Sequence, residues 1–352
     1  MYEQGVIRPP SEANSLLVRV TRNCPWNKCV FCPAYKGTKF SLRTLEEIKG
    51  DIDSMAAECQ GPSNQVRTAF LQDADSLLLP TPELLEILRY LKEKFPGIER
   101  LTSYARATTL RRKGVEDFRQ LRKGGLLRVH TGLESGSAAV LKMISKGITP
   151  EDVVEGGRHV MEAGISLSEY IMPGVAGRTL SREHVAETVK LLSIVRPDFI
   201  RVRTFALHPL SPLNKMIQEG TFVPLNDEEM VAEIRFLVAN LPEMHTYFSC
   251  GDYGRNLLMR IDGYLDRDKA AMLAELDRYL SLTGEQKRAY SLLRRSSYIN
   301  YPLDVLFNED IMDRLRPELA KLAKGGQAVF DKYIQTLAAA GLPEPRGGAW
   351  KD

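Results

Sequence analysis

The chain has 352 residues, of which 43% are hydrophobic and 26% are charged, so its composition is that of a globular protein and excludes a disordered or fibrous one. Its formal net charge of +3 comes from basic and acidic residues that are interleaved throughout, which gives no strong nucleic-acid signature. No apolar run approaches the roughly 20 residues that span a bilayer, and the N-terminus lacks the apolar region of a signal peptide. These features predict a cytoplasmic protein without a membrane span.

Short apolar runs alternate with amphipathic segments after an irregular lead-in over residues 1–15. The pattern predicts strand 16–21, helix 44–58, strand 67–71, helix 81–94, strand 99–105, helix 114–122, strand 127–133, helix 150–163, strand 166–171, helix 181–195 and strand 198–204. Repeated strand-helix units require parallel strands joined by right-handed crossovers. The pattern alone fits a barrel and an open doubly wound sheet nearly equally well.

The pattern changes after residue 250. The stretch 209–224 is rich in proline, glycine and polar residues and predicts a loop, followed by a helix near 227–240 and a strand near 244–249. Beyond residue 255 only helical patterns follow, at 267–281, 284–296, 309–324 and 326–340. We therefore expect four parts, which are the lead-in 1–15, a core over 16–250, a helical region over 251–342 and a flexible tail over 343–352.

Three of the five cysteines lie within nine residues, directly after the first predicted strand. Cys24, Cys29 and Cys32 have the spacing C-x4-C-x2-C, and no fourth cysteine or histidine nearby completes the tetrahedral shell of a structural zinc site. A cubane [4Fe-4S] cluster held by three cysteines keeps one iron open to an exogenous ligand. Cys59 and Cys250 are isolated, so no disulfide framework is predicted and a reducing compartment suits the chain.

The three-cysteine motif resembles that of the radical SAM superfamily, and Phe31 before the last cysteine fits the usual pattern of that family. The first interval is one residue longer than the commonest C-x3-C-x2-C spacing, which points to a distinct subfamily. The resemblance implies an α/β fold, a partial (β/α)6 TIM-like barrel with a helical C-terminal extension. It also implies two cofactors, a [4Fe-4S] cluster and S-adenosylmethionine (SAM), which is cleaved to a 5'-deoxyadenosyl radical. The core is similar to the Elp3/MiaB/HemN-like branch, and the oxygen sensitivity of such a cluster implies largely anaerobic conditions.

Later segments resemble the SAM-binding motifs of the same family, in the expected order. Gln72, Asp73 and Asp75 stand in place of a Gly-Gly-Glu-like segment that contacts the methionyl amino group, and they depart from it by lacking its glycines. Glu134, in a Gly-Leu-Glu-Ser-Gly stretch, matches the acid that binds the ribose hydroxyls. The structural alternative for Glu134 is a carboxylate at the N-terminus of the helix that follows.

The segment 171–177 resembles the part of the family fold whose backbone contacts adenine. It contains Met172 and Gly174, and its glycines permit a close approach of the backbone to a ligand. Its position after the other motifs carries more weight than its composition, because glycine-containing turns are common.

The two-residue period of the strands predicts which side chains point away from the covering helices. Helices that cover a barrel need apolar strand faces, so the polar faces should line the lumen. The charged set on those faces comprises Arg128, His130, Glu134, Arg201 and Arg203. Arg106 fits the same face of its strand, but the neighbouring residues leave that assignment open.

A bound ligand explains this charge, because SAM carries a sulfonium, an ammonium and a carboxylate, whereas burying unpaired charge costs several kcal/mol per group. Two alternatives remain at this stage. The arginines pair with Glu134, Asp73 or Asp75 in a structural network, or the register of the strands is off by one.

Three further residues lie near strand ends. Cys250 and Tyr253 follow the strand near 244–249, where a hydrogen-atom donor or a methyl-carrying thiol could act, and the alternative for Cys250 is a small buried hydrophobe. His208 follows the sixth strand and is either a substrate or SAM contact or an ordinary loop histidine.

Three functions are compatible with these features. The first is a radical SAM enzyme that abstracts hydrogen from a small-molecule or lipid-precursor substrate and takes electrons from an external donor such as flavodoxin or ferredoxin. The second is a non-enzymatic iron-sulfur or metal-binding regulatory module with a fourth protein ligand, Cys59 or Cys250. The third is a tRNA- or RNA-modifying enzyme, which we rank lower because no RNA-binding appendage is recognisable and the basic stretches 111–113 and 119–123 fit a solvated helix face.

Overall fold

The computed structural model describes residues 2–59, 66–297, 299–345 and 350, and the chain divides into two compact units. The first unit holds residues 1–133, 145–170 and 344–352, and the second holds 134–144 and 171–343. The strands of the main sheet are mostly parallel, which confirms the predicted α/β class. The boundaries expected at residues 15, 250 and 342 stay predictions.

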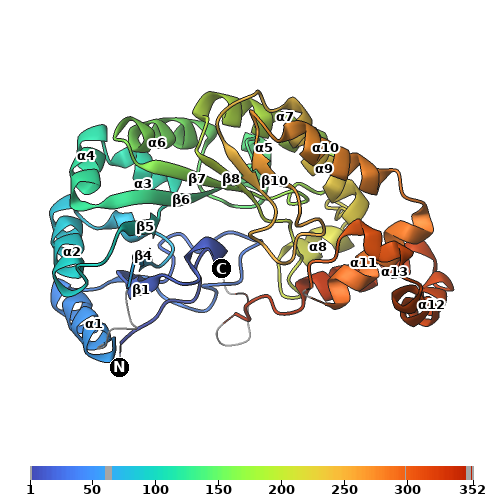
Figure 1. The fold of residues 1–352 in the computed structure, drawn as a ribbon, viewed down its shortest axis with the longest axis horizontal. Coiled ribbons are helices and arrows are strands. Elements are labelled where there is room, and N and C mark those ends of the chain that lie inside the picture. Colours follow the sequence, from blue (N-terminus) through green and yellow to red (C-terminus); the bar gives the residue numbers. More distant parts are fainter. Residues whose placement is uncertain (1, 60–65, 298, 346–349, 351–352) are drawn as a thin grey trace. The chain divides into compact units, whose positions relative to one another are not determined.

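The first unit is built on five neighbouring strands. Their order is β1 (Leu16–Arg19), β4 (Thr68–Gln72), β5 (Arg100–Tyr104), β6 (Leu126–Glu134) and β7 (Ser166–Ile171). The pairs β1 with β4, β4 with β5 and β5 with β6 are parallel. The connecting helices are α1 (Leu45–Glu58), α2 (Thr81–Lys94), α3 (Ala107–Arg112), α4 (Val115–Gly124) and α6 (Pro150–Glu162), and Figure 1 shows α1, α2 and α4 along the outer side of the strands.

Helix α2 illustrates why these segments fold as they do. Leu84, Ile87, Leu88 and Leu91 follow the helical spacing and are all fully buried, while Glu86 and Arg89 between them are polar. Burial of a leucine or isoleucine side chain contributes about 1.5–3 kcal/mol, so this stripe fixes the face that α2 turns to the core.

The cysteine motif lies in sequence between two short strands that pair antiparallel with each other. They are β2 (Thr21–Arg22) and β3 (Ser41–Leu42). We call the connecting residues 23–40 the cysteine loop. Two short 3-10 helices, Pro10–Glu12 and Ser76–Leu78, complete the first unit.

The second unit carries a short sheet and most of the C-terminal helices. Strand β8 (Phe199–Val202) pairs in parallel with β9 (Tyr247–Ser249), which pairs antiparallel with β10 (Asp262–Tyr264). The helices are α5 (Ala138–Met143), α7 (Gly177–Val195), α8 (Leu213–Gln218), α9 (Asp227–Asn240), α10 (Lys269–Leu280), α11 (Gly284–Ser296), α12 (Glu309–Ala323) and α13 (Gly326–Ala339), with a 3-10 helix at Leu303–Phe307.

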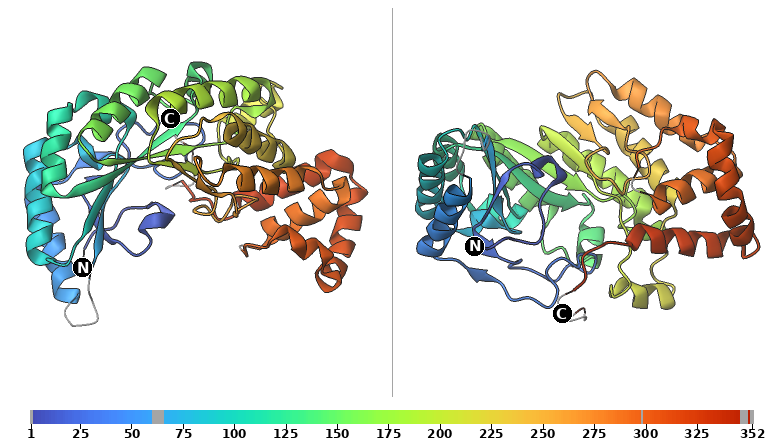
Figure 2. Two further views of the ribbon diagram at one scale, coloured as in Figure 1. Left: turned by 45° about the horizontal axis from the view of Figure 1, so that its top comes forward. Right: turned by 60° about the horizontal axis from the view of Figure 1, so that its bottom comes forward.

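The last three helices, drawn in orange and red, lie next to one another in Figure 2. They pack around a small apolar core of their own, which contains Leu292, Leu322, Phe330 and Ile334. Hydrogen bonds from Arg294 of α11 connect this region to the chain that follows β9. The buried Arg294 donates to the carbonyl oxygens of Gly254, Asn256, Leu257 and Ile299. The helical extension is therefore fastened through backbone groups as well as apolar contacts.

Most predicted elements have the observed type, with several corrections. A strand, β10, lies beyond residue 255, where only helices were expected, and helix α8 lies in the expected loop 209–224. The short helices α3 and α5 were missed, and α7 begins at Gly177 instead of residue 181. The expected flexible tail falls partly on residues 346–349 and 351–352, which lie outside the described residues.

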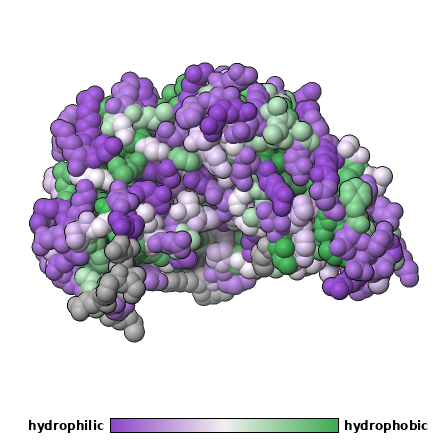
Figure 3. Space-filling view, in the orientation of Figure 1, coloured by the Kyte–Doolittle hydropathy of each residue, from purple (hydrophilic) through white to green (hydrophobic). Residues whose placement is uncertain are grey.

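The surface in Figure 3 is largely hydrophilic, with apolar side chains interspersed. Single exposed apolar residues such as Ile194 and Phe307 are ordinary on a protein surface. No helix in the described part of the chain combines the length and the apolarity that crossing a membrane requires.

Candidate functional site

The three clustered cysteines lie on the cysteine loop, half-buried and free of disulfides. Asn23 and Asn27 have φ values of 68° and 46°, which turn the loop sharply on either side of Cys24. Asparagine tolerates this left-handed conformation better than most residues. The Asn27 N–H donates to Cys24 Sγ over 3.4 Å.

The donor set of the cysteine loop fits an iron-sulfur cluster. Within the described residues no group of three or more His, Cys, Asp or Glu side chains that could hold a metal ion is found. Three cysteine thiols outside any disulfide, all on one loop, are the ligand type that such clusters take.

Aromatic rings of the cysteine loop lie close to cationic side chains, both from the loop and from neighbouring segments. The Trp26 indole N–H donates to the Ser145 carbonyl over 2.7 Å, and the guanidinium carbon of Arg106 lies 5.2 Å from the centre of the Trp26 ring. Lys28 Nζ lies at the same distance from that ring, and Lys146 Nζ lies 5.7 Å from the Phe31 ring. These distances are in the range of cation–π contacts.

Gln72 and Asp73, predicted to meet the amino group of SAM, contact other parts of the first unit. Gln72 accepts from the Gly5 N–H and donates to the Ile7 carbonyl, each over 2.8 Å. The Asp73 carboxylate accepts from Arg19 Nε and from the Asn23 N–H over 2.8 Å, and from the Tyr35 hydroxyl over 3.2 Å. Burial and the negative charge of Asp73 raise the pKa of Tyr35, so this hydroxyl keeps its proton and donates.

Asp75 and Arg106 are joined where β4 and β5 end. Asp75 accepts from the Arg106 N–H over 3.2 Å and from the Thr109 hydroxyl over 2.7 Å. Burial raises the pKa of Asp75 to about 6 in spite of these donors. The Arg106 side chain donates to the carbonyl oxygens of Lys146 and Gly147 over 3.2 Å and 2.9 Å.

The polar strand face of the first unit carries a structural network that includes a residue of the lead-in. His130 Nε2 lies 3.3 Å from Glu12 Oε1, and both side chains are fully buried. Burial raises the pKa of Glu12, but hydrogen bonds from His130 and Ser15 outweigh it, so the pKa is lowered overall. Rings of Phe70, Tyr104 and Tyr170 surround His130, and Arg128 donates to the Ser166 hydroxyl over 3.4 Å. Glu12, for which the sequence indicated no role, is therefore a partner of His130 on this face.

In the second unit, the backbone joins Glu134 to the segment 171–177. The Glu134 carbonyl accepts from the Met172 N–H over 3.0 Å, and Glu134 has a left-handed φ of 61° with its side chain buried. Gly174 has a φ of 88°, and a Cβ there would lie 2.9 Å from Met230 Sδ, so both conformation and space require glycine. The structure thus brings together the segments matched to ribose and adenine contacts.

A buried polar group that sequence reasoning missed supports these two segments. Glu233 accepts from the Gly174 N–H over 2.7 Å and from the Ser181 hydroxyl over 2.6 Å, and burial raises its pKa to about 7. His184 Nδ1 lies 2.8 Å from Ser135 Oγ, and burial lowers the pKa of His184 to about 4. Glu233 and His184 belong to different helices, so no local pattern in the sequence links them.

The remaining predicted site residues of the second unit lie on or after β8 and β9. Arg201 forms an ion pair with Asp252, and the guanidinium carbon of Arg203 lies 5.1 Å from the Tyr253 ring centre. Cys250 is fully buried, and burial raises the pKa of its thiol. His208 is buried in the loop after β8, where its Nδ1 accepts from the Leu210 N–H over 3.1 Å.

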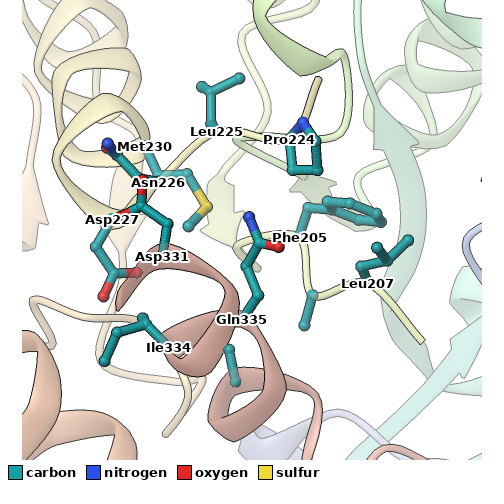
Figure 4. Close-up of a pocket in the computed structure, with 12 residues that line it drawn as sticks. Phe205, Leu207, Pro224, Leu225, Asn226, Asp227, Met230, Asp331, Ile334 and Gln335 are labelled. Carbon is teal, nitrogen blue, oxygen red and sulfur yellow. The ribbon is translucent and has the colours of Figure 1, made fainter. Parts of the chain in front are cut away.

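Each unit contains a cavity lined by described residues. The second unit has a cavity of about 20 Å³ beside α13, where Asp331, Ile334 and Gln335 face Phe205 and Leu207 (Figure 4). That volume holds about one water molecule. The first unit has an open cleft of about 660 Å³, which includes the first residues of three strands, Leu16, Thr68 and Arg100. The cysteine loop follows the carboxyl end of β1, so this cleft lies at the opposite edge of the strands.

The fold and the motifs define an α/β cofactor-binding enzyme of the class expected from the cysteine motif. Residues 18–192 match the family model described as the radical SAM superfamily, and this chain belongs to that superfamily. Its cofactors are accordingly a [4Fe-4S] cluster and SAM. The superfamily consists of enzymes, so the non-enzymatic alternative is not retained.

Relatives of known name match only part of the chain. A "tRNA uridine(34) acetyltransferase" of Methanocaldococcus infernus is 20% identical over 257 residues, which cover 62% of this chain and 48% of the relative. An "uncharacterized methyltransferase" of Pyrococcus horikoshii is 24% identical over 195 residues, which cover 55% and 40% of the two chains. The chain thus spans about half the length, or less, of the curated relatives it matches.

Solved structures show a more distant similarity. Coproporphyrinogen III oxidase (HemN) from Escherichia coli has a TM-score of 0.48 at 17% identity, covering 64% of this chain and 51% of that one. The radical SAM methyltransferase TsrM from Kitasatospora setae, with cobalamin and a [4Fe-4S] cluster bound, has a TM-score of 0.48 at 17% identity, covering 86% and 61%.

Proposed function

We propose that this radical SAM enzyme modifies a nucleotide of a transfer RNA or a similar RNA. The observation that carries the proposal is the match of 257 residues to two proteins named tRNA uridine(34) acetyltransferase, from Methanocaldococcus infernus and Methanocaldococcus jannaschii. This alternative, ranked lower from the sequence alone, is now better supported than a small-molecule substrate.

The positive charge on and beside the cysteine loop supports the proposal that the substrate is anionic. Lys28 and Lys39 are exposed, and Arg106 and Lys146 place further positive charge beside Trp26 and the loop. Cations interleaved with aromatic rings are the side chains with which proteins bind unpaired nucleotides, through phosphate contacts and base stacking. The basic stretch on α3 and α4 is less suited to RNA, because Arg111 is paired with Asp152 and Glu155.

We further propose roles for the residues that match the family motifs. Cys24, Cys29 and Cys32 would hold the cluster, Glu134 would accept hydrogen bonds from the ribose of SAM, and the backbone of 171–177 would contact its adenine. When bound, the reduced cluster supplies an electron that cleaves SAM to a 5'-deoxyadenosyl radical. Asp75 and Arg106 are the proposed partners of the charged methionyl end of SAM.

The other predicted residues have weaker support. Arg201, Arg203 and His208 stay candidates for contacts to SAM or substrate, although Arg201 is paired with Asp252 and Arg203 lies over Tyr253. Cys250 and Tyr253 stay candidates for hydrogen-atom donation. The buried thiol of Cys250 has a raised pKa, which favours the protonated form that such a donor needs.

A small-molecule or lipid-precursor substrate has less support. The cavity beside α13 has room for about one water molecule. The two relatives named tRNA uridine(34) acetyltransferase each match 62% of this chain. An external electron donor such as flavodoxin or ferredoxin is proposed for either substrate, because cluster reduction needs one.

The test is a tRNA-dependent turnover assay under anaerobic conditions. Holoenzyme, SAM and a reductant are incubated with total tRNA, and digested nucleosides are compared with a reaction that lacks SAM. We expect a nucleoside of altered mass and a binding affinity that falls steeply with salt. Lys28→Ala should weaken tRNA binding, whereas Arg158→Ala, which removes an exposed cation of α6, should leave it unchanged. An intact holoenzyme that binds no tRNA and changes no nucleoside would refute the proposal.

A further inference from the structure

One carboxylate of the first unit receives hydrogen bonds from both sides of the cysteine loop. Asp73 Oδ2 accepts from the Asn23 N–H, directly before Cys24, and Asp73 Oδ1 accepts from the Tyr35 hydroxyl, three residues after Cys32. The distances are 2.8 Å and 3.2 Å. Hydrogen bonds to a single side chain, Asp73, therefore hold the chain at both ends of the twelve residues from Cys24 to Tyr35.

The carboxylate is itself held by an ion-pair chain. Arg19 Nε donates to Asp73 Oδ2 over 2.8 Å, and Arg19 Nη2 donates to Asn23 Oδ1 over 3.2 Å. Glu3 of the lead-in binds Arg19 Nη1 over 2.5 Å, and Arg43 donates to the Arg19 carbonyl over 2.7 Å. Arg19 thus fixes both the acceptor and the loop residue that binds it.

Space around Asp73 argues against a second role as a ligand contact. The side chain has no exposed surface, and a Cβ added at Gly5 would lie 2.3 Å from Asp73 Oδ1. The lead-in backbone therefore covers the carboxylate. Three donors already satisfy it, and a buried charged acceptor with three donors is costly to disturb.

We propose that Asp73 is a positioning residue that holds the two ends of the cysteine loop so that its three thiols can converge on the cluster. The sequence comparison with the family placed Asp73 at the amino group of SAM, and the contacts point to the loop instead. This inference rests on the proposed assignment of Cys24, Cys29 and Cys32 as cluster ligands.

Hydrogen bonds within the cysteine loop show how a loss of the Asp73 contacts would alter the positions of the thiols. The Asn27 side chain donates to the Tyr35 carbonyl over 2.7 Å, and the Lys36 ammonium donates to the Asn27 carbonyl over 2.7 Å. Asn27 in turn directs its N–H at Cys24 Sγ. A displacement of Tyr35 would therefore move the backbone beside Cys24.

The test compares Asp73→Asn and Tyr35→Phe with the control Glu12→Gln. Glu12 is also a fully buried carboxylate of the first unit with three partners, Ser15, His130 and Arg100, none of them in the cysteine loop. Tyr35→Phe removes one hydroxyl and keeps the ring, so it serves if Asp73→Asn does not fold. The first readout is the rate of alkylation of each cysteine in the metal-free protein, with Cys59 as the internal reference.

We expect Asp73→Asn to speed alkylation of Cys24, Cys29 and Cys32 relative to Cys59 by about tenfold, because a charge-assisted contact to the loop is weakened. Tyr35→Phe should have a smaller effect, and none when added to Asp73→Asn. Glu12→Gln should leave the ratio unchanged. In the holoenzyme, chelator-driven iron loss should accelerate in the same order.

Two results would overturn the inference. One is an alkylation ratio for Asp73→Asn equal to that of Glu12→Gln. The other is a loss of SAM affinity in Asp73→Asn with unchanged alkylation and iron retention, which would make Asp73 a SAM ligand. Retention of the cluster by a Cys24→Ala variant would instead refute the cluster assignment, and the alkylation ratio would still decide the role of Asp73 because it needs no metal.

Discussion

Gly147 packs directly against Trp26 of the cysteine loop, and the variant Gly147→Ala tests whether that contact holds the loop in place. A Cβ at this position would lie 2.3 Å from two atoms of the indole ring, and the residue has a φ of 66°. The substitution therefore strains the backbone and also pushes the ring away. The same ring donates to the Ser145 carbonyl and lies beside Arg106.

The expected loss of stability is the sum of three effects. Alanine in a left-handed conformation costs about 1–2 kcal/mol relative to glycine. Loss of the indole hydrogen bond adds about 0.5–1.5 kcal/mol, and loss of the cation–π contact with Arg106 adds about 0.5–1 kcal/mol. Gly147→Ala should thus lower the free energy of unfolding by roughly 2–4.5 kcal/mol.

Gly164→Ala is the matched control, because Gly164 has a φ of 74° and no atom lies within 4 Å of an added Cβ. Gly164→Ala introduces the same backbone strain without a steric clash, so it should lower the free energy of unfolding by only about 1–2 kcal/mol. The assay is urea unfolding, with Trp26 fluorescence recorded in a Trp350→Phe background to remove the other tryptophan. Gly147→Ala should shift the emission to the red and hasten iron loss from the holoenzyme. Equal stability of the two variants with unchanged Trp26 emission would refute the reasoning.

Two further variants test the second unit. Arg294→Lys should lower the free energy of unfolding by about 2–4 kcal/mol and expose the chain after β9 to proteases. The reason is that a lysine cannot replace a guanidinium that donates to four carbonyl oxygens. An unchanged pattern of proteolytic fragments would contradict this prediction. Glu233 has a pKa raised to about 7 in the folded chain, so its contribution to stability is full below pH 4.5 and is lost as the pH rises to about 7. The stability of the wild type relative to Glu233→Gln should therefore fall by roughly 3 kcal/mol over that range in urea titrations, and a difference that does not depend on pH would contradict the burial of the acid.

Elements with strong local signals could be predicted from the sequence. Helix α2 has the predicted bounds 81–94 because its leucine and isoleucine spacing is regular, and the cysteine loop was found because its three cysteines are adjacent in sequence. Strand β10 was missed because it has only three residues, Asp262 to Tyr264, too few to show an alternation. Periodicity detects long elements and overlooks short ones.

Contacts between distant residues could not be predicted in the same way. Glu12 and His130 are 118 residues apart, and the strand pattern indicated that His130 faces inward without indicating its partner. The resemblance to the family assigned Asp73 by its place in a motif, whereas its partners Arg19, Asn23 and Tyr35 are set by the packing of the loop. Such partners depend on tertiary structure, which a motif does not encode.

The most direct test of the account is whether the three cysteines support SAM cleavage. The protein is reconstituted anaerobically with iron and sulfide, reduced with dithionite and incubated with SAM, and 5'-deoxyadenosine is measured by mass spectrometry. We predict 5'-deoxyadenosine from the wild type and none from Cys24→Ala, Cys29→Ala or Cys32→Ala. A wild-type protein with a spectroscopically intact [4Fe-4S] cluster that neither binds nor cleaves SAM would contradict it.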